Sequence, residues 1–198
     1  MNQLPRLFSL AFFATTIIVR LVPHPPHISS VAALALFAGC YLSVWQGAVL
    51  TFGAMAISDS IGHFLELPSM GFYDRVTMLA VYFSMVLVAA IGRALRGRVS
   101  WLTVPAASLA GTALFFLITN FMCWLDPLMG YSQTVAGLVA CYTAGLAFLG
   151  DTNPAVNLLL GNLFFSAAFF GLYQVALAKA KSPSPQQNET VTVEIEQS

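Results

Sequence analysis

Long apolar runs recur from one end of the chain to the other, and short polar breaks separate them. Six of these runs are predicted to be helices: residues 7–22, 30–42, 47–64, 76–92, 101–125 and 157–178. A helix needs about 20 residues to cross roughly 30 Å of hydrocarbon, and the run 30–42 is the shortest at about 20 Å. A further stretch, 131–149, is moderately apolar and rich in small residues. The pattern predicts an all-α helix bundle over residues 1–181 and a disordered polar tail over 182–198.

The stretch 31–63 is predicted to organise the bundle. Two apolar segments, VAALALFAGCYL and AVLTFGAMAISDSIGH, lie back to back with only SVWQG between them. Asp59 and His63 end the second segment and are four residues apart, which places them on one helical face. Ionisable side chains at the end of a membrane helix are candidates for a functional site. We therefore expect the other helices to surround this hairpin, with a pocket over its acidic end.

Composition narrows the class of protein. The 198 residues are 58% hydrophobic and 8% charged, and the mean hydropathy is +0.80. A soluble domain carries about 25% charged residues, so this chain is predicted to be a multi-pass membrane protein in contact with the lipid bilayer. A net charge of zero without a basic run excludes nucleic acid as a partner. The three cysteines stand singly in apolar runs, as small packing residues do.

Positive charge predicts the orientation. Arg93, Arg96 and Arg98 form the one dense basic loop, which assigns that loop to the cytoplasmic side. Counting spans from this loop places both termini in the cytoplasm if 131–149 is a re-entrant or interfacial segment on the outer side. If 131–149 were a seventh span, Lys179 and Lys181 would face outward instead. We therefore prefer six spans plus a re-entrant segment, in the plasma (inner) membrane.

Under this topology, polar side chains gather at the outer end. Loop acids such as Glu66 and Asp126 are expected to be solvated. The predicted substrate-binding residues are His24, His27, Asp59, His63, Asn120, Trp124, Asp151 and Asn157. Amide and aromatic groups suit a small planar organic molecule. Histidine with carboxylate is also ordinary ligation chemistry for a transition metal, and the set for a metal would be His24, His27, Asp59 and His63.

Several motifs in order carry a resemblance to a known family. They are PHPPHISSVAALALFAG, MAISD, LFFLITNF, AGLVACYTAGLAF and NLLLGNLFFSAAFFGLY. Together they resemble an uncharacterised family of bacterial membrane transport proteins over residues 20–173. That family is in turn similar in layout to the substrate-binding (S) components of energy-coupling factor (ECF) transporters.

This resemblance implies a six-helix bundle that captures a vitamin, a vitamin precursor or a metal ion near the outer face. The loop over residues 23–30 would act as a lid, and a transmembrane subunit with ATPases would energise uptake. Two features depart from the pattern. His27 stands where the family usually has asparagine, and Ala11 and Ala14 are three apart, unlike the alanine-xxx-alanine patch of many S components.

Two other function classes stay open. An intramembrane enzyme would need catalytic residues, and the chain has no HExxH and no GxSxG motif, although Asp59 and His63 have the chemistry of an acid–base pair. A structural or assembly role would use the small-residue faces for contact with a partner complex. We expect solute capture without catalysis and without a cofactor.

Overall fold

The computed structural model describes residues 3–23, 25, 27–67, 75–147 and 153–181. These residues form seven α-helices and one short 3-10 turn, and no strand occurs among them. In chain order the elements are α1 (Leu4–Leu21), α2 (Val31–Tyr41), α3 (Val44–Phe64), α4 (Arg75–Ala94), α5 (Thr103–Leu125), η1 (Pro127–Met129), α6 (Val135–Leu146) and α7 (Pro154–Lys181). The predicted fold class, an all-α membrane helix bundle, is confirmed at this level.

The lengths of the helices separate them into two groups. Within the described ranges, α1, α4, α5 and α7 are long and apolar enough to cross a membrane. The helix α3 has 21 residues but is less apolar, because it carries polar residues such as Gln46, Ser58 and Asp59. The helices α2 and α6 have 11 and 12 residues, which is about 17 Å and too short for a span. By length and composition, four of the described helices qualify as spans, so six spans plus a re-entrant segment stays a prediction.

The helix α2 lies at the centre of the bundle. Every residue from Val31 to Cys40 is buried, and α2 contacts α1, α3, α4, α5 and α7. A helix surrounded on all sides has no polar face, which explains why its sequence is apolar throughout. The prediction that the stretch 31–63 organises the bundle agrees with this central place.

Two glycines let α2 and α4 cross with their backbones in contact. A Cβ on Gly39 would collide with the backbone carbonyl of Ala89, and a Cβ on Gly92 would collide with that of Leu36. The start of α3 joins the same crossing, since a Cβ on Gly47 would lie 2.9 Å from the Gly39 amide nitrogen. Small residues are what allow membrane helices to approach this closely.

The break between α2 and α3 is shorter than predicted. The sequence placed a polar break over SVWQG, whereas α3 begins at Val44. Ser43 explains this early start, because its Oγ accepts a hydrogen bond from the backbone N–H of Gln46 at 3.1 Å. A serine in this position is a typical N-cap.

An aromatic cluster joins α1, α2 and α7 on the other side of α2. The rings of Phe12 and Phe169 stack with their centroids 4.0 Å apart, and Phe37 meets Phe12 and Tyr173 edge to face. Such pairs add roughly 0.5–1.5 kcal/mol each to the burial of the rings.

A polar contact joins α5 to α7 inside the bundle. The Nδ2 of Asn162 donates to Thr112 Oγ1 at 2.8 Å, and Ser166 Oγ donates to Ser108 Oγ at 3.3 Å. All four side chains are buried. Hydrogen bonds between membrane helices are worth about 0.6–2 kcal/mol, so these contacts fix the pairing of α5 with α7.

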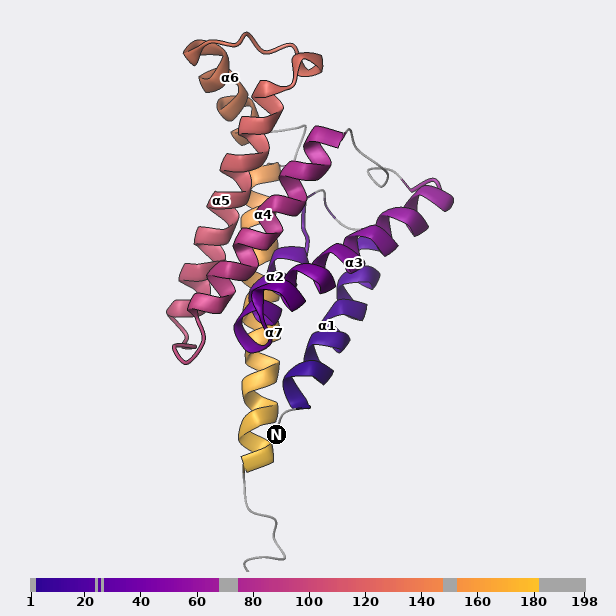
Figure 1. Cartoon of the computed structure of the whole chain (residues 1–198), viewed down its shortest axis with the longest axis vertical. Coiled ribbons are helices and arrows are strands. Elements are labelled where there is room, and N and C mark those ends of the chain that lie inside the picture. Colours follow the sequence, from indigo (N-terminus) through magenta and orange to yellow (C-terminus); the bar gives the residue numbers. More distant parts are fainter. Residues whose placement is uncertain (1–2, 24, 26, 68–74, 148–152, 182–198) are drawn as a thin grey trace, which may run out of the picture.

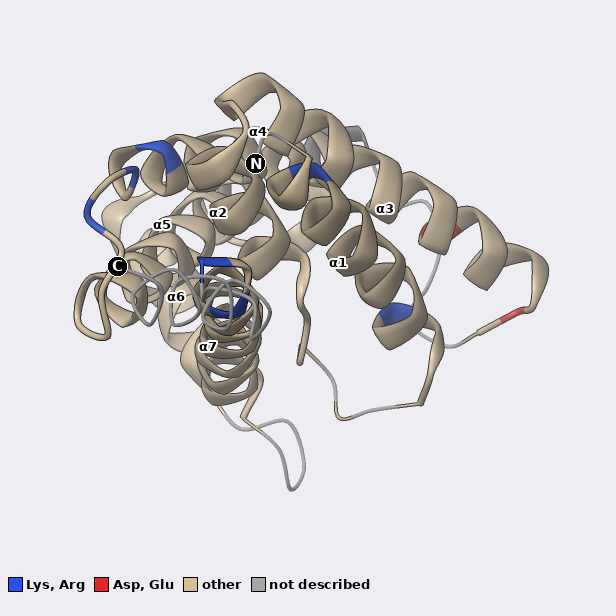
Figure 2. Ribbon diagram, turned by 90° about the horizontal axis from the view of Figure 1, so that it is seen from below, with Lys and Arg blue, Asp and Glu red and all other residues tan. Residues whose placement is uncertain are grey.

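Charge separates the two ends of the molecule. The N-terminus and the last turn of α7 lie at the lower end in Figure 1, and α6 lies at the upper end. Basic residues mark the lower end, where α1 and α5 begin and α4 and α7 end: Arg6, Arg93, Arg96, Arg98, Lys179 and Lys181. Figure 2 looks at this end and shows its Lys and Arg segments. The described acids, Asp59, Glu66 and Asp126, belong to the far ends of α3 and α5.

The crossing of α2 and α4 predicts a specific sensitivity. Gly39→Ala would force the two backbones apart and should lower the free energy of unfolding by about 1–3 kcal/mol, the usual cost of overpacking. Gly171→Ala is the matched control, because it lies in a helix with nothing within 4 Å of the added Cβ. Unfolding of the purified protein in detergent measures both variants. Equal stability of the two variants would contradict the close approach.

Candidate functional site

A partly buried ion pair connects α1 with α3. Arg20, in the last turn of α1, donates from Nη2 to Asp59 Oδ1 at 2.5 Å and from Nε to Ser58 Oγ at 2.7 Å. The hydroxyl of Ser58 in turn donates to the carbonyl oxygen of Met55 at 3.0 Å. The two charged side chains keep 18% and 9% of their surface exposed, so the pair is partly covered by the bundle and partly accessible from outside.

This arrangement changes the role predicted for Asp59. The sequence grouped Asp59 with His63, but the structure pairs Asp59 with Arg20, and the side chain of His63 is exposed in the last turn of α3. A lone arginine within an apolar run needs an anionic partner. This requirement could have identified Arg20 as a site residue from the sequence. Sequence reasoning also gave no role to Ser58, whose hydroxyl holds the guanidinium.

A second group of predicted residues lies between α5 and α6. The indole Nε1 of Trp124 donates to the carbonyl oxygen of Ser132 at 2.9 Å, and Gln133 Nε2 donates to the carbonyl oxygen of Trp124 at 2.6 Å. Asn120 donates to Phe116 in its own helix, and its side chain lies against Gly145 of α6. These bonds fix the segment between α5 and α6. They also give Asn120 and Trp124 hydrogen-bond partners within the protein.

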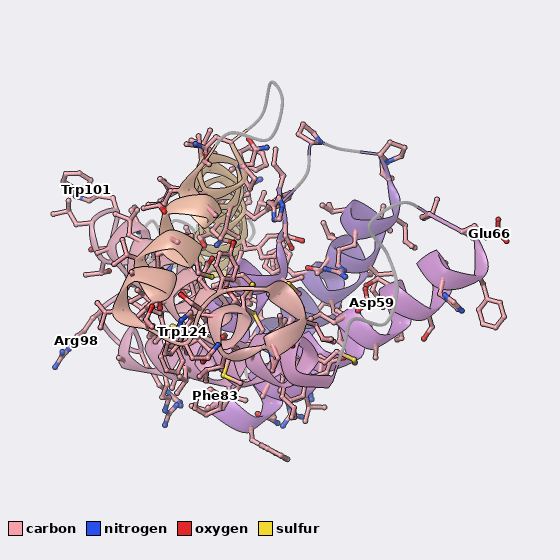
Figure 3. All side chains as sticks on the ribbon, turned by 90° about the horizontal axis from the view of Figure 1, so that it is seen from above. Asp59, Glu66, Phe83, Arg98, Trp101 and Trp124 are labelled. Carbon is pink, nitrogen blue, oxygen red and sulfur yellow. The ribbon has the colours of Figure 1, made fainter. Side chains whose placement is uncertain are left out.

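The structure does not bring these two groups together. In the view of Figure 3, Asp59 lies on α3 well to one side of Trp124 on α5. No hydrogen bond or ion pair links Asp59 to Asn120 or Trp124 in the described part of the chain. The predicted site is thus divided between the α1–α3 pair and the α5–α6 corner.

The remaining predicted residues lie near the connections. His27 precedes α2, is exposed and has a left-handed backbone with φ 66°. The protein around its imidazole removes part of the hydration, which lowers the pKa of His27 from its ordinary value. Asn157 is half-buried in the first turn of α7. His24 and Asp151 lie outside the described residues.

The described residues do not form a metal centre. No group of three or more His, Cys, Asp or Glu side chains is placed to hold a metal ion in the ranges that the structure covers. The carboxylate of Asp59, the central member of the predicted set, already bonds to Arg20.

Two surface grooves lie away from the predicted residues. One groove of about 650 Å³ runs between α4, α5 and α6, and residues such as Leu79, Phe83, Phe121 and Tyr142 line it. Another, of about 450 Å³, lies between the start of α1 and the junction of α2 with α3. Neither groove contains a predicted site residue.

The ion pair can be tested by a double-mutant cycle. Asp59→Leu alone leaves the partly buried guanidinium of Arg20 without its carboxylate and should cost about 1–3 kcal/mol of unfolding free energy, as should Arg20→Met alone. The double variant removes both charges and should regain most of that loss. Unfolding in detergent measures all three, and losses that simply add would contradict a coupled pair.

Comparison with known proteins supports one assignment. No curated protein and no solved structure matches this chain. A family model matches residues 2–186, which is nearly the whole chain. The chain therefore belongs to a family of unknown function, DUF6580.

Proposed function

We propose that the protein is a membrane transport component that captures a small polar organic solute beside Arg20 and Asp59. The observation that carries this proposal is the buried ion pair itself. Well-packed apolar residues are often as stable as a buried ion pair, so stability alone gives little reason to keep one inside an apolar bundle. Charged groups within membrane helices usually serve a solute, an ion or a proton.

The chemistry of the pair favours an organic solute over a metal ion. A guanidinium presents several N–H donors in a rigid plane, and the carboxylate accepts hydrogen bonds beside it. Together they match a molecule that carries both donors and acceptors. A cation would have to displace Arg20 from Asp59, and no other described histidine, cysteine or acid completes a set of three ligands there. The metal alternative therefore has less support than the organic one.

The proposed topology has six crossings with α6 at the outer end. In Figure 1 the chain passes along the bundle in α1, α4, α5 and α7, and α6 stays at the end opposite the start of α1 and the last turn of α7. The short helix α2 would cross together with the segment before it. Gly161 of α7 lies against Ile28 and Ser29, and Ser30 bonds to Thr16 of α1 at 3.1 Å. Non-helical backbone is tolerated at membrane depth where protein covers it in this way.

The basic residues support an orientation with both termini in the cytoplasm. Arg6, the loop between α4 and α5, and the last turn of α7 share one end of the molecule, and positive charge favours the cytoplasmic side. In that orientation Arg20 and Asp59 lie toward the outside, where a captured solute would arrive. The resemblance to ECF S components adds that an energising subunit with ATPases would complete uptake in the inner membrane.

A binding screen tests this proposal. Purified protein is heated in detergent with each member of a panel of vitamins, their precursors, other polar organic solutes and divalent metals. A ligand at 100 times its dissociation constant should stabilise the folded protein by about 2.7 kcal/mol. We expect an organic solute to do so with the wild type and not with the double variant Arg20→Met, Asp59→Leu.

The control variant is Asp126→Asn. Asp126 is a second buried acid, at 8% exposure, and its Oδ1 accepts from the backbone of Leu128, a bond that asparagine keeps. This variant should bind the solute as the wild type does. Equal binding by the double variant would place the site elsewhere, and no binding across the whole panel would contradict solute capture.

A further inference from the structure

A groove at the basic end has the polarity of a lipid site. It is the groove of about 450 Å³ between the start of α1 and the α2–α3 junction. Arg6, Trp45 and Gln46 lie at its outer rim, in the first turns of α1 and α3. Leu10 and Val49 follow Arg6 and Trp45 by four residues, which places them on the same faces one turn deeper. The groove therefore changes from charged to apolar along its length.

The apolar part of the groove is open to the surroundings. Leu10 is 57% exposed and Val49 is 52% exposed. Because α1 is long and apolar enough to span a membrane, an exposed leucine on it would face hydrocarbon rather than water, and Val49 of α3 lines the same groove. An extended acyl chain is the partner that such a surface meets in a bilayer.

The charged part of the groove holds Arg6, which has no acidic partner among the described residues. In that part of the chain the ion pair joins Arg20 and Asp59, and the described acids belong to the opposite end of the molecule. An anion from outside the described chain would therefore find a free guanidinium at the rim. Trp45 beside it is 72% exposed, and tryptophan in such a place is typical of the level of the lipid headgroups.

A buried hydroxyl in the groove wall adds an independent observation. Ser9 lines the groove and is fully buried, yet its Oγ has no hydrogen-bond partner. It lies three residues after Arg6, on the same helical face. An unsatisfied buried polar atom is uncommon in proteins, and this hydroxyl would gain a partner if a bound molecule reached it through the groove wall.

We propose that this groove binds an anionic phospholipid. The phosphate would lie on Arg6, with the Gln46 amide beside it and the Ser9 hydroxyl below, and one acyl chain would run along Leu10 and Val49. The basic end is the one that the positive-inside rule assigns to the cytoplasmic leaflet, which carries the anionic lipids. This site is independent of solute capture at the other end.

Native mass spectrometry of the full chain in detergent tests the proposal. The probes are phosphatidylglycerol and phosphatidylcholine with identical acyl chains. We expect the wild type to retain phosphatidylglycerol in preference to phosphatidylcholine, and Arg6→Gln to reduce phosphatidylglycerol retention about fivefold. Val49→Trp, which fills the apolar part of the groove, should reduce retention of both lipids.

The matched control is Arg98→Gln. Arg98 is an exposed arginine at the same basic end and does not line the groove, so its removal should leave lipid retention within twofold of the wild type. Equal losses in Arg6→Gln and Arg98→Gln would reduce the effect to general charge and overturn the site. Equal retention of the two lipids by the wild type would also overturn it and leave the groove to another occupant, such as a protein subunit.

Discussion

The close approach of α2 to α4 is the constraint on which the rest of the bundle depends. Gly39 and Gly92 remove the side chains that would keep the two backbones apart, and the short helix α2 is then enclosed by five other helices. An enclosed helix of 11 residues is too short to cross a bilayer alone, and a non-helical segment precedes it. Gly161 of α7 provides room for that segment against Ile28 and Ser29. The centre of the bundle is therefore packed through backbone contacts that only glycine allows.

The charged residues differ between the two ends of the bundle. Six basic residues lie at the end where α1 begins and α7 ends, while the ion pair between Arg20 and Asp59 lies toward the other end. Both features are costly in lipid unless water, a partner charge or a ligand compensates them. Asp59 compensates the charge of Arg20 within the protein, and a phospholipid phosphate bound to Arg6 would compensate the charge of that arginine from outside. The two proposed sites therefore follow from the same physical requirement at opposite ends of the bundle.

Sequence patterns predicted the helices well and the site poorly, for a physical reason. Hydropathy depends on local composition, so it located the apolar runs and the central place of residues 31–63. Spacing along a helix shows which residues share a face, but not which helix that face meets. Arg20 and Asp59 are 39 residues apart in the chain, and their pairing depends on how α1 lies on α3. The same limit applies to Asn120 and Trp124. Both contact the region of α6, which lies apart from Asp59. The start of α3 was placed three residues too late for a smaller reason, the capping hydroxyl of Ser43.

The sidedness of the bundle is the claim on which both proposed sites rest, and cysteine accessibility measures it most directly. Single cysteines replace Ser100, in the basic connection between α4 and α5, and Ser132, between α5 and α6, after Cys40, Cys123 and Cys141 are changed to alanine. A membrane-impermeant thiol reagent is then applied to spheroplasts and to inverted membrane vesicles. The account predicts that position 132 reacts in spheroplasts and position 100 reacts in inverted vesicles. Reaction of both positions from the same side would contradict it.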